Sequence, residues 1–481
     1  MEDFKIEPVE KIEILSKENF LRELSEGISR GAGAVCYFGL PYSEGVRLFA
    51  SLLNPSGEIK TLSCAAVDKL TSLTPFYPQL HLFEREIAER TGLKFEGHPM
   101  ANPVRYEDGK TASSGSYFQI QGDEIHEVSV GPVHAGVIEP GHFRFQCLGE
   151  NVFNLQIELG YQHRGVEKAI CDGPDKRTLA LIETAAGDTS IGHAWTYAKL
   201  VEALSSVKVP ERAVFLRGVA LELERMANHI GDLGALSGDV AYMPTASFCG
   251  RIRGEVLNIT ALLCGNRFGR NFIVPGGVSF DADEKLVKEM LKRLYDAFED
   301  ASSAISLLWE RKTVMDRFER TGLVSEEIAS KLRLVGPAAR ASGINCDLRS
   351  IFKTIPYNDF EAEPLTLKGD VFARAYIRWM EIKKSYKLIK NWLENLPSGD
   401  IRIDPSALRP DCFALALTEG WRGEICHACL SDSKGRIYFY KIKDPSFHNW
   451  QGLAMALRNG QISDFPLCNK SFNLSYCGHD L

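Results

Sequence analysis

The chain has no long apolar run. Across its 481 residues, no stretch approaches the ~20 apolar residues needed to span a bilayer. The first segment, MEDFKIEPVEKIEIL, has no apolar core of the kind a secretory signal needs. A formal charge of −7 argues against nucleic acid as a main partner. No Gly-x-Gly-x-x-Gly, phosphate-loop or Gly-x-Ser-x-Gly motif is found, so we do not expect NAD or nucleotides to bind directly.

What is present is typical of a globular protein of two or three domains, with 44% apolar and 25% charged residues. Twelve cysteines are scattered along the chain. One pair has the C-x-x-C spacing, Cys426 and Cys429, in a segment that predicts two strands joined by a turn. On a strand these two thiols point to opposite faces. This favours structural cysteines, with a metal or redox pair as the alternative.

Residues 1–103 predict a small α/β domain. Two apolar runs, 34–41 and 61–67, are typical of strands, and residues 42–54 between them have helical spacing. Residues 72–99 resemble the signature of the 30-kDa subunit of respiratory complex I, with a helix packed by Leu82, Phe83 and Ile87 and its charges expected on the exposed face. The matching residues are Glu84, Arg85, Glu86, Gly92, Phe95, Gly97, His98 and Pro99. The Gly- and Ser-rich residues 104–122 predict a linker.

Residues 123–481 predict a mainly helical domain with peripheral strands, so the fold class is α+β. Alternating residues in FRFQ and FNLQIEL indicate antiparallel strands. Four long helical patterns follow, at 176–204, 210–234, 244–264 and 283–318. Segments 336–349 and 369–389 resemble those shared by complex I 49-kDa subunits and hydrogenase large subunits. The resemblance covers essentially the whole chain, as a fusion of 30-kDa-like and 49-kDa-like parts typical of energy-converting (group 4, formate-hydrogenlyase-type) hydrogenase large subunits.

The two metal-binding segments of that family are present without their cysteines. Residues 183–202 resemble the first segment, with Glu183, Gly187, His193 and Tyr197 in register. The chain ends NLSYCGHDL, which resembles the second, and no further tail is expected to be clipped. A nickel centre is held by thiolates in these hydrogenases, and alanine offers no ligand. The four vacated ligand positions are Ala186, Thr189, Ser475 and Gly478.

The segment GPVHAGVIEPGHFRF contains His134, Glu139 and His142. The resemblance implies proton relay for Glu139, as in hydrogenases. It implies quinone contact for the position of this hairpin that falls nearest Pro140 or His142, as in complex I, and His134 matches the first His of the Gly-Pro-x-His motif of complex I. His134, His142 and His193 are therefore candidates for a quinone-like cavity, and His142 is also a catalytic candidate. Histidine titrates near neutral pH, and a carboxylate with a raised pKa transfers protons. The alternative is a structural hairpin whose histidines bond to the backbone.

Three further residues are candidates for functional groups in the vacated cage, the place where the four vacated ligand positions meet. Asp188 is expected either to carry a proton or to cap the helix that starts near Ser190. His193 keeps the position beside the metal cage, or is a satisfied core histidine. Arg422 matches the arginine that holds the iron ligands in hydrogenases. As a buried cation it needs a partner, and Glu183, Asp188 and Glu424 are candidates.

The sequence therefore leads to three functional hypotheses. In the first, the chain is a peripheral-arm subunit of a membrane-bound respiratory oxidoreductase, and its former metal cavity handles protons or a quinone. In the second it is a catalytically silent scaffold of such a complex. In the third it is an active nickel–iron hydrogenase using Cys468 and Cys477.

The resemblance implies a small iron–sulfur subunit (20-kDa-like) and membrane subunits as partners, on the cytoplasmic side of the inner membrane. No cofactor is expected to bind directly apart from a quinone. The iron–sulfur cluster belongs to the partner.

Overall fold

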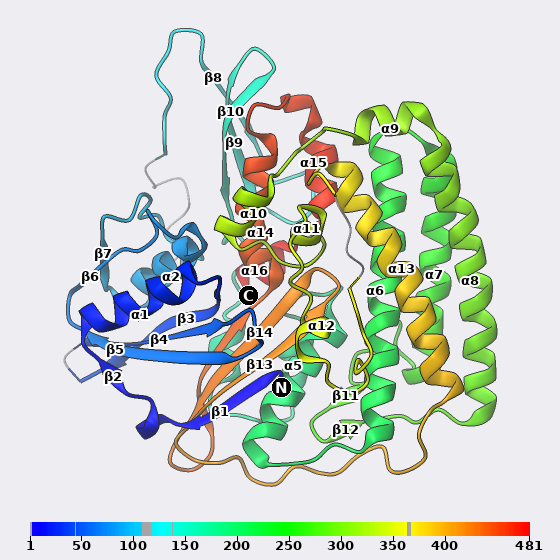
Figure 1. Cartoon of the computed structure of the whole chain (residues 1–481), viewed down its shortest axis with the longest axis horizontal. Coiled ribbons are helices and arrows are strands. Elements are labelled where there is room, and N and C mark those ends of the chain that lie inside the picture. The colour runs from blue at the N-terminus through cyan, green and yellow to red at the C-terminus, as the bar shows by residue number, and fades with distance from the viewer. Residues whose placement is uncertain (1, 44, 108–116, 137, 363–366) are drawn as a thin grey trace.

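Two four-stranded sheets lie face to face where the N-terminal region meets the rest of the chain (Figure 1). The structure is a computed structural model that describes residues 2–43, 45–107, 117–136, 138–362 and 367–481. Stacked rings connect the sheets, with Phe38 4.6 Å from Phe439 and Phe49 6.0 Å from Phe413 between ring centroids. The two regions therefore share a continuous apolar interface.

The N-terminal sheet has the strand order β2-β5-β4-β3. Helices α1 and α2 cover the face that points away from the second sheet, and two short strands, β6 and β7, pair beside them. The elements are β2 (Ile14–Leu15), α1 (Lys17–Ser29), β3 (Gly33–Tyr42), β4 (Gly45–Leu53), β5 (Ile59–Ala66), β6 (Lys69–Thr71), α2 (His81–Thr91) and β7 (Lys94–Glu96).

Two predictions for this region were wrong. Residues 42–54 do not form a helix, because Gly45–Leu53 is the strand β4. Both faces of β4 are buried, so its apolar run carries no alternation, and periodicity alone does not separate such a strand from a buried helix. Helix α2 does form, but Glu84 and Glu86 are buried rather than on an exposed face.

The second sheet has the order β1-β13-β14-β15. Its edge strand β1 (Phe4–Pro8) comes from the start of the chain and pairs antiparallel with β13 (Cys412–Gly420). The predicted hairpin is confirmed as β14 (Gly423–Ser431) and β15 (Ile437–Lys443). Cys426 packs between the two sheets, and Cys429 packs on the opposite face, as alternation requires.

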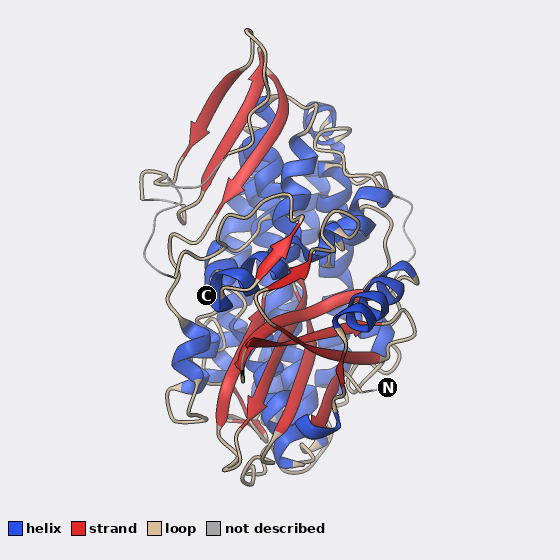
Figure 2. Cartoon of the chain, turned by 90° about the vertical axis from the view of Figure 1, so that its left-hand side faces the viewer, coloured by secondary structure: helices blue, strands red, loops and turns tan. Residues whose placement is uncertain are grey.

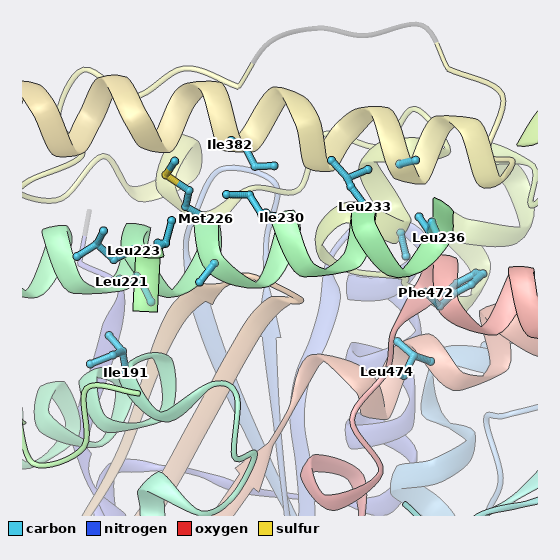
Figure 3. Packing of buried hydrophobic residues seen from close by; sticks show 14 of the residues in the cluster. Ile191, Leu221, Leu223, Met226, Ile230, Leu233, Leu236, Ile382, Phe472 and Leu474 are labelled. Atoms are coloured by element: carbon cyan, nitrogen blue, oxygen red, sulfur yellow. The ribbon is translucent and has the colours of Figure 1, made fainter. Parts of the chain in front are cut away.

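Four long helices pack side by side at the right-hand side of Figure 1, opposite the N-terminal sheet. They are α6 (Glu211–Asp239), α7 (Met243–Cys264), α8 (Glu284–Glu310) and α13 (Val371–Glu394). Met226, Ile230 and Leu233 of α6 face Ile382 and its neighbours on α13 (Figure 3). Asp283 and Asp370 cap α8 and α13 by accepting from backbone N–H groups.

The shorter elements connect this bundle to the sheets. A separate antiparallel sheet, β8 (His126–Val130), β9 (His142–Leu148) and β10 (Asn151–Glu158), projects from one end of the molecule (Figure 2). The remaining elements are α3 (Val166–Ile170), α4 (Thr178–Glu183), α5 (Ser190–Ser205), β11 (Ile273–Val274), β12 (Gly277–Val278), α9 (Lys312–Phe318), α10 (Glu326–Leu332), α11 (Gly336–Ala341), α12 (Leu348–Phe352), α14 (Pro445–Leu457), α15 (Phe465–Phe472) and α16 (Tyr476–Asp480), together with short 3-10 turns.

The helical patterns predicted for the second domain form helices, with two interruptions. The pattern at 176–204 is divided into α4 and α5 by a loop at residues 184–189, and the pattern at 283–318 is divided into α8 and α9. None of the described residues forms a helix that is both long and apolar enough to cross a bilayer. Part of the predicted linker, residues 108–116, lies outside the described residues. Val104 and Arg105 at its start are buried.

Candidate functional site: a cage without thiolates

The four vacated ligand positions lie in the loop at residues 184–189 and at the start of α16, and Arg422 contacts both segments, through Asp188 and through the Asn473 carbonyl. Ala186 is fully buried and brings only a methyl group. The Thr189 hydroxyl accepts from Trp421 Nε1 at 3.0 Å, and Ser475 Oγ accepts from the Gly478 backbone N–H at 2.9 Å. A Cβ added to Gly478 would lie 2.7 Å from Cγ of Asp444, so a side chain has no room there. This donor set does not fit a thiolate-held nickel ion.

An ion pair between Asp188 and Arg422 spans the same region. Arg422, in the turn between β13 and β14, donates to both Asp188 carboxylate oxygens at 2.6 and 2.8 Å. It also donates to the Asn473 carbonyl at 2.6 Å, and its guanidinium lies 3.8 Å from the Trp421 ring centroid. Of the three candidate partners, the structure pairs Arg422 with Asp188.

The two ends of this pair differ in exposure. The Arg422 side chain is 5% exposed and that of Asp188 is 35% exposed. Burial alone would raise the pKa of Asp188, but the guanidinium outweighs it and holds that pKa below its ordinary value. Burial opposes the charge of Arg422, and Asp188 more than compensates, so the pKa of Arg422 is raised. The pair is therefore charged, and Asp188 does not cap α5.

Glu224, on α6, caps α5 instead. Its carboxylate accepts from the backbone N–H groups of Ile191 and Gly192 at 2.8 and 3.2 Å. Burial raises the pKa of Glu224 to about 8, although the two hydrogen bonds oppose that shift. Burial also raises the pKa of Glu183, at the end of α4, to about 7. Two carboxyl groups beside the vacated loop thus titrate near neutral pH.

A chain of four buried side chains begins at Asp444. His193 Nε2 lies 3.1 Å from Asp444 Oδ2, and His193 Nδ1 lies 3.0 Å from His427 Nε2. His427 Nδ1 in turn lies 2.8 Å from the Tyr440 hydroxyl. Burial lowers the pKa of His427 well below its ordinary value, and the bond from His193 helps to keep the pKa of Asp444 low despite burial.

One direction follows for this chain when His193 is neutral. An ionised Asp444 only accepts, so His193 donates to it from Nε2, and a neutral His193 accepts at Nδ1. His427 then donates from Nε2 and accepts at Nδ1 from Tyr440. All three hydrogen bonds then run from Tyr440 towards Asp444, the carboxylate beside Gly478.

The predicted hairpin residues lie apart from this chain. Glu139 is exposed and accepts from Gln162 at 2.9 Å, and it also contacts the Cys477 thiol, which lies 3.4 Å from Ser475 Oγ. His134 Nε2 bonds to the Gly141 carbonyl at 2.8 Å. His142 Nδ1 lies 3.7 Å from Glu158. The structure thus brings Asp188, Arg422, His193 and Glu139 around the vacated positions, and leaves His134 and His142 outside.

The sequence analysis named none of Asp444, His427, Tyr440 and Glu224 as a site residue. Asp444 precedes Pro445 and caps α14, which is the only role its local sequence suggests. His427 lies next to Cys426 on β14, and nothing in its local sequence marks it as a site residue. Cys468, one of the two thiols considered for an unusual metal site, packs near Gly322 and Arg374.

The fold and the emptied cage together define a class: a hydrogenase-type large-subunit domain with an additional α/β domain fused at its N-terminus. The family "Respiratory-chain NADH dehydrogenase, 49 Kd subunit" matches residues 239–411 and 405–480, and "Respiratory-chain NADH dehydrogenase, 30 Kd subunit" matches residues 33–110. The chain belongs to the 49-kDa-subunit family, with a 30-kDa-type domain fused to it, as the sequence resemblance predicted.

Two relatives and one solved structure are similar to this chain. The carbon monoxide-induced hydrogenase of Rhodospirillum rubrum is 30% identical over 72% of this chain and 97% of its own length. Hydrogenase-4 component G of Escherichia coli is 28% identical over 87% of this chain and 77% of its own. The fold is shared with a chain of the membrane-bound sulfane sulfur reductase, an archaeal respiratory membrane complex (TM-score 0.68, 23% identity, 74% of this chain and 99% of that one).

Glu224 provides a pH test of the site. An unfolded glutamate has a pKa near 4.5, and the folded value is about 8. The folded state therefore binds more protons between these values, so the free energy of unfolding falls as pH rises from about 5 to 8, by on the order of 4 kcal/mol. We expect Glu224→Gln to flatten this dependence in urea unfolding at pH 6 and pH 9. Glu211→Gln, at the exposed start of the same helix, is the control. Parallel curves for wild type and Glu224→Gln would contradict the prediction.

Proposed function

We propose that this chain is a peripheral-arm subunit of a membrane-bound oxidoreductase complex of the complex I and energy-converting hydrogenase type, and that its vacated cage handles protons without a nickel–iron centre. The observation that carries the proposal is the Asp188–Arg422 pair lying among the four vacated ligand positions. The family membership supports the first part, since several relatives are named as membrane-bound hydrogenase or NADH-quinone oxidoreductase subunits.

In this proposal, the ionised Asp444 takes up a proton that is released at the cage and returns it when it is needed there. His193, His427 and Tyr440 hold that carboxylate in place through their hydrogen bonds, and each keeps its own proton. Glu139, which reaches Ser475 through Cys477, offers a route to solvent. Glu224 and Glu183, whose pKa values lie near 8 and 7, take up or release protons beside the loop at residues 184–189.

A small iron–sulfur subunit and membrane subunits are the partners we propose, with the assembly on the cytoplasmic side of the membrane. The electrons would arrive through the cluster of the iron–sulfur subunit. A quinone remains the proposed acceptor. His134 already bonds to a backbone carbonyl, and His142 faces Glu158, so we propose that Asp188, whose side chain is 35% exposed, is the residue that meets the quinone.

The direct test is the metal content of the complex purified from its native membranes. We expect nickel well below one atom per chain by mass spectrometry, because the cage offers no thiolate, while iron from the partner cluster is retained. Substituting cysteine at Ala186 and Thr189 is the matched variant, and it should not restore nickel while Gly478 and Ser475 are unchanged. Stoichiometric nickel, or hydrogen uptake by the wild-type complex, would overturn the proposal.

The silent-scaffold function has one observation in its favour. The two polar side chains at the vacated positions already have partners, since Thr189 bonds to Trp421 and Ser475 to Gly478, and the neighbouring Asp188 is paired with Arg422. A scaffold needs only hydrogen bonds of this kind, which stay formed. Proton transfer at the cage requires some of them to break. Turnover of a complex carrying Asp188→Asn separates the two functions, as described in the Discussion.

A further inference from the structure

A large cavity lies between the 30-kDa-type domain and the second domain. Its volume is about 670 Å³, within the range of small-molecule sites. Apolar side chains form most of its walls. They come mainly from α2, β10, α10 and α14, and they include Leu82, Leu155, Leu332 and Met455. The cavity therefore offers room and an apolar surface for the body of a small molecule.

The charged side chains that line this cavity are mostly cations. They are Arg85 of α2, Lys331 of α10 and Arg458 at the end of α14, against one carboxylate, Glu158 of β10. Lys331 is paired at 2.6 Å with Glu327, which lies outside the lining. No carboxylate of the described residues lies within 4.0 Å of either arginine. Three cations thus meet two carboxylates, which leaves one positive charge in excess at the cavity.

Arg85 is the cation that can hold an anion in this cavity. Its side chain is half-buried, and its Nε and Nη2 atoms donate to the Asn102 and Pro103 carbonyls at 2.6 and 2.9 Å. Its third nitrogen, Nη1, has no hydrogen-bond partner among the described residues and keeps accessible surface. Glu89, one turn further along α2, instead accepts from backbone N–H groups. Burial lowers the pKa of Arg85, and an anion at Nη1 would counteract that shift.

Two histidines lie near Arg85 in the wall of the cavity. His81 is one turn before Arg85 on α2, so the two side chains share a face of the helix. Its ring is half-buried and has no hydrogen-bond partner among the described residues. His479 uses Nδ1 for a 3.0 Å bond to Asp480, and its Nε2 is left unbonded. Burial, with Arg85, His98 and His479 nearby, lowers the pKa of His81 to about 3, so the ring is neutral and has one N–H to donate.

We propose that this interdomain cavity binds an amphipathic carboxylate, a small molecule with one carboxylate group and an apolar body. The carboxylate accepts from Arg85 Nη1 and from the His81 ring N–H, and the apolar body lies against Leu155 and Leu332. An uncharged molecule would leave Arg85 without a counterion, and a cation would be repelled by it. Because the walls belong to two domains, the bound molecule stabilises the contact between them. This site does not depend on the function of the vacated cage.

The test is calorimetric titration of the full chain at pH 7 with three probes of similar shape. They are the anion 4-phenylbenzoate, the uncharged 4-phenylbenzamide and the cation 4-phenylbenzylamine. We expect saturable one-to-one binding of 4-phenylbenzoate and a rise in melting temperature that grows with its concentration. The amide should bind at least about tenfold more weakly, because it forms no charge-assisted hydrogen bond with Arg85. The amine should show no saturable binding.

Arg85→Gln removes the cation and should weaken the binding of 4-phenylbenzoate by at least about tenfold. Arg47→Gln is the matched control. Arg47 is also a buried arginine of the N-terminal region that donates to backbone carbonyls, but it lines no part of this cavity. This variant should bind 4-phenylbenzoate as the wild type does.

Thermal unfolding checks that each variant is folded. If Arg85→Gln does not fold, Arg85→Lys keeps the charge and should still bind 4-phenylbenzoate more tightly than the amide. The proposal is overturned by absence of saturable binding of 4-phenylbenzoate to the wild type, by equal binding of the amide, or by tighter binding of the amine. No weakening in Arg85→Gln, or equal weakening in Arg47→Gln, would overturn it as well.

Discussion

Asp188→Asn is expected to lower the free energy of unfolding by about 2–4 kcal/mol, because it leaves the buried Arg422 cation without its carboxylate. Removing one partner of a buried pair costs about 3–5 kcal/mol, and the partial exposure of Asp188 reduces that figure. Arg422→Gln should cost less, since the remaining Asp188 is one-third exposed and gains water. Urea unfolding of the purified chain at pH 7 measures both changes.

The informative result is which of the two variants lowers the free energy of unfolding more. If Arg422→Gln destabilised the chain more than Asp188→Asn, the assignment of Arg422 as the buried end of the pair would be wrong. The same Asp188→Asn chain, assembled in its complex, also separates the two functional hypotheses. We expect proton-coupled turnover to fall by at least about tenfold if the cage handles protons. Unchanged turnover in an intact complex would favour a scaffold.

Glu86→Ala is expected to have the largest effect on stability, about 3–5 kcal/mol. Glu86, on α2, bonds to Arg105 and to Lys441 of β15, and both cations are 1% exposed. Glu167 bonds to the same lysine at 3.1 Å, and Arg90 bonds to Glu167. Without Glu86, Arg105 and the partly protonated Lys441 share Glu167 with Arg90, while Arg90 also keeps the more exposed Glu107 at 2.7 Å. Urea unfolding followed by tryptophan fluorescence measures the loss.

Lys441→Met is the comparison within this cluster. Burial lowers the pKa of Lys441 to about 7, so the lysine is partly neutral at neutral pH. The unfolded lysine binds its proton up to about pH 10.5, so this group adds stability as pH rises from about 7 to 10.5. We expect Lys441→Met to remove that rise and to cost far less than Glu86→Ala at pH 7. Glu26→Ala, at an exposed pair with Arg30, should cost less than about 1 kcal/mol. An equal loss for Glu86→Ala and Glu26→Ala would contradict this account.

The elements with strong local signals were predictable from sequence. The β14–β15 hairpin has a turn-rich connection between two strand-like segments, and the long helices of the bundle have clear apolar spacing. Strand β4 was mistaken for a helix because it is buried on both faces, a property that depends on a second sheet whose strands β13, β14 and β15 lie more than 350 positions further along the chain. Local pattern does not carry such information.

The candidate site shows the same limit. Sequence register identified Asp188, Arg422 and His193, because the emptied ligand positions mark where the cage lies. It left three partners open for Arg422, since the choice depends on a contact between residues 234 positions apart. Asp444 and Glu224 were not recognised, because each looks like an ordinary helix residue or cap until tertiary packing places it beside the loop at residues 184–189.

Strand β1 has a consequence for how the chain is made. Phe4 pairs with Ala416, so β1 lacks this neighbour until about 400 further residues have been synthesised. At about 5–20 residues per second this is a delay of roughly 20–80 s. The 30-kDa-type domain has its complete sheet long before then, so it would be expected to fold first and to present an apolar surface that awaits β13–β15. That apolar surface stays exposed during translation until β13, β14 and β15 are made. A good yield of native protein therefore requires either a chaperone that binds this surface or rapid docking of these strands once they have been synthesised.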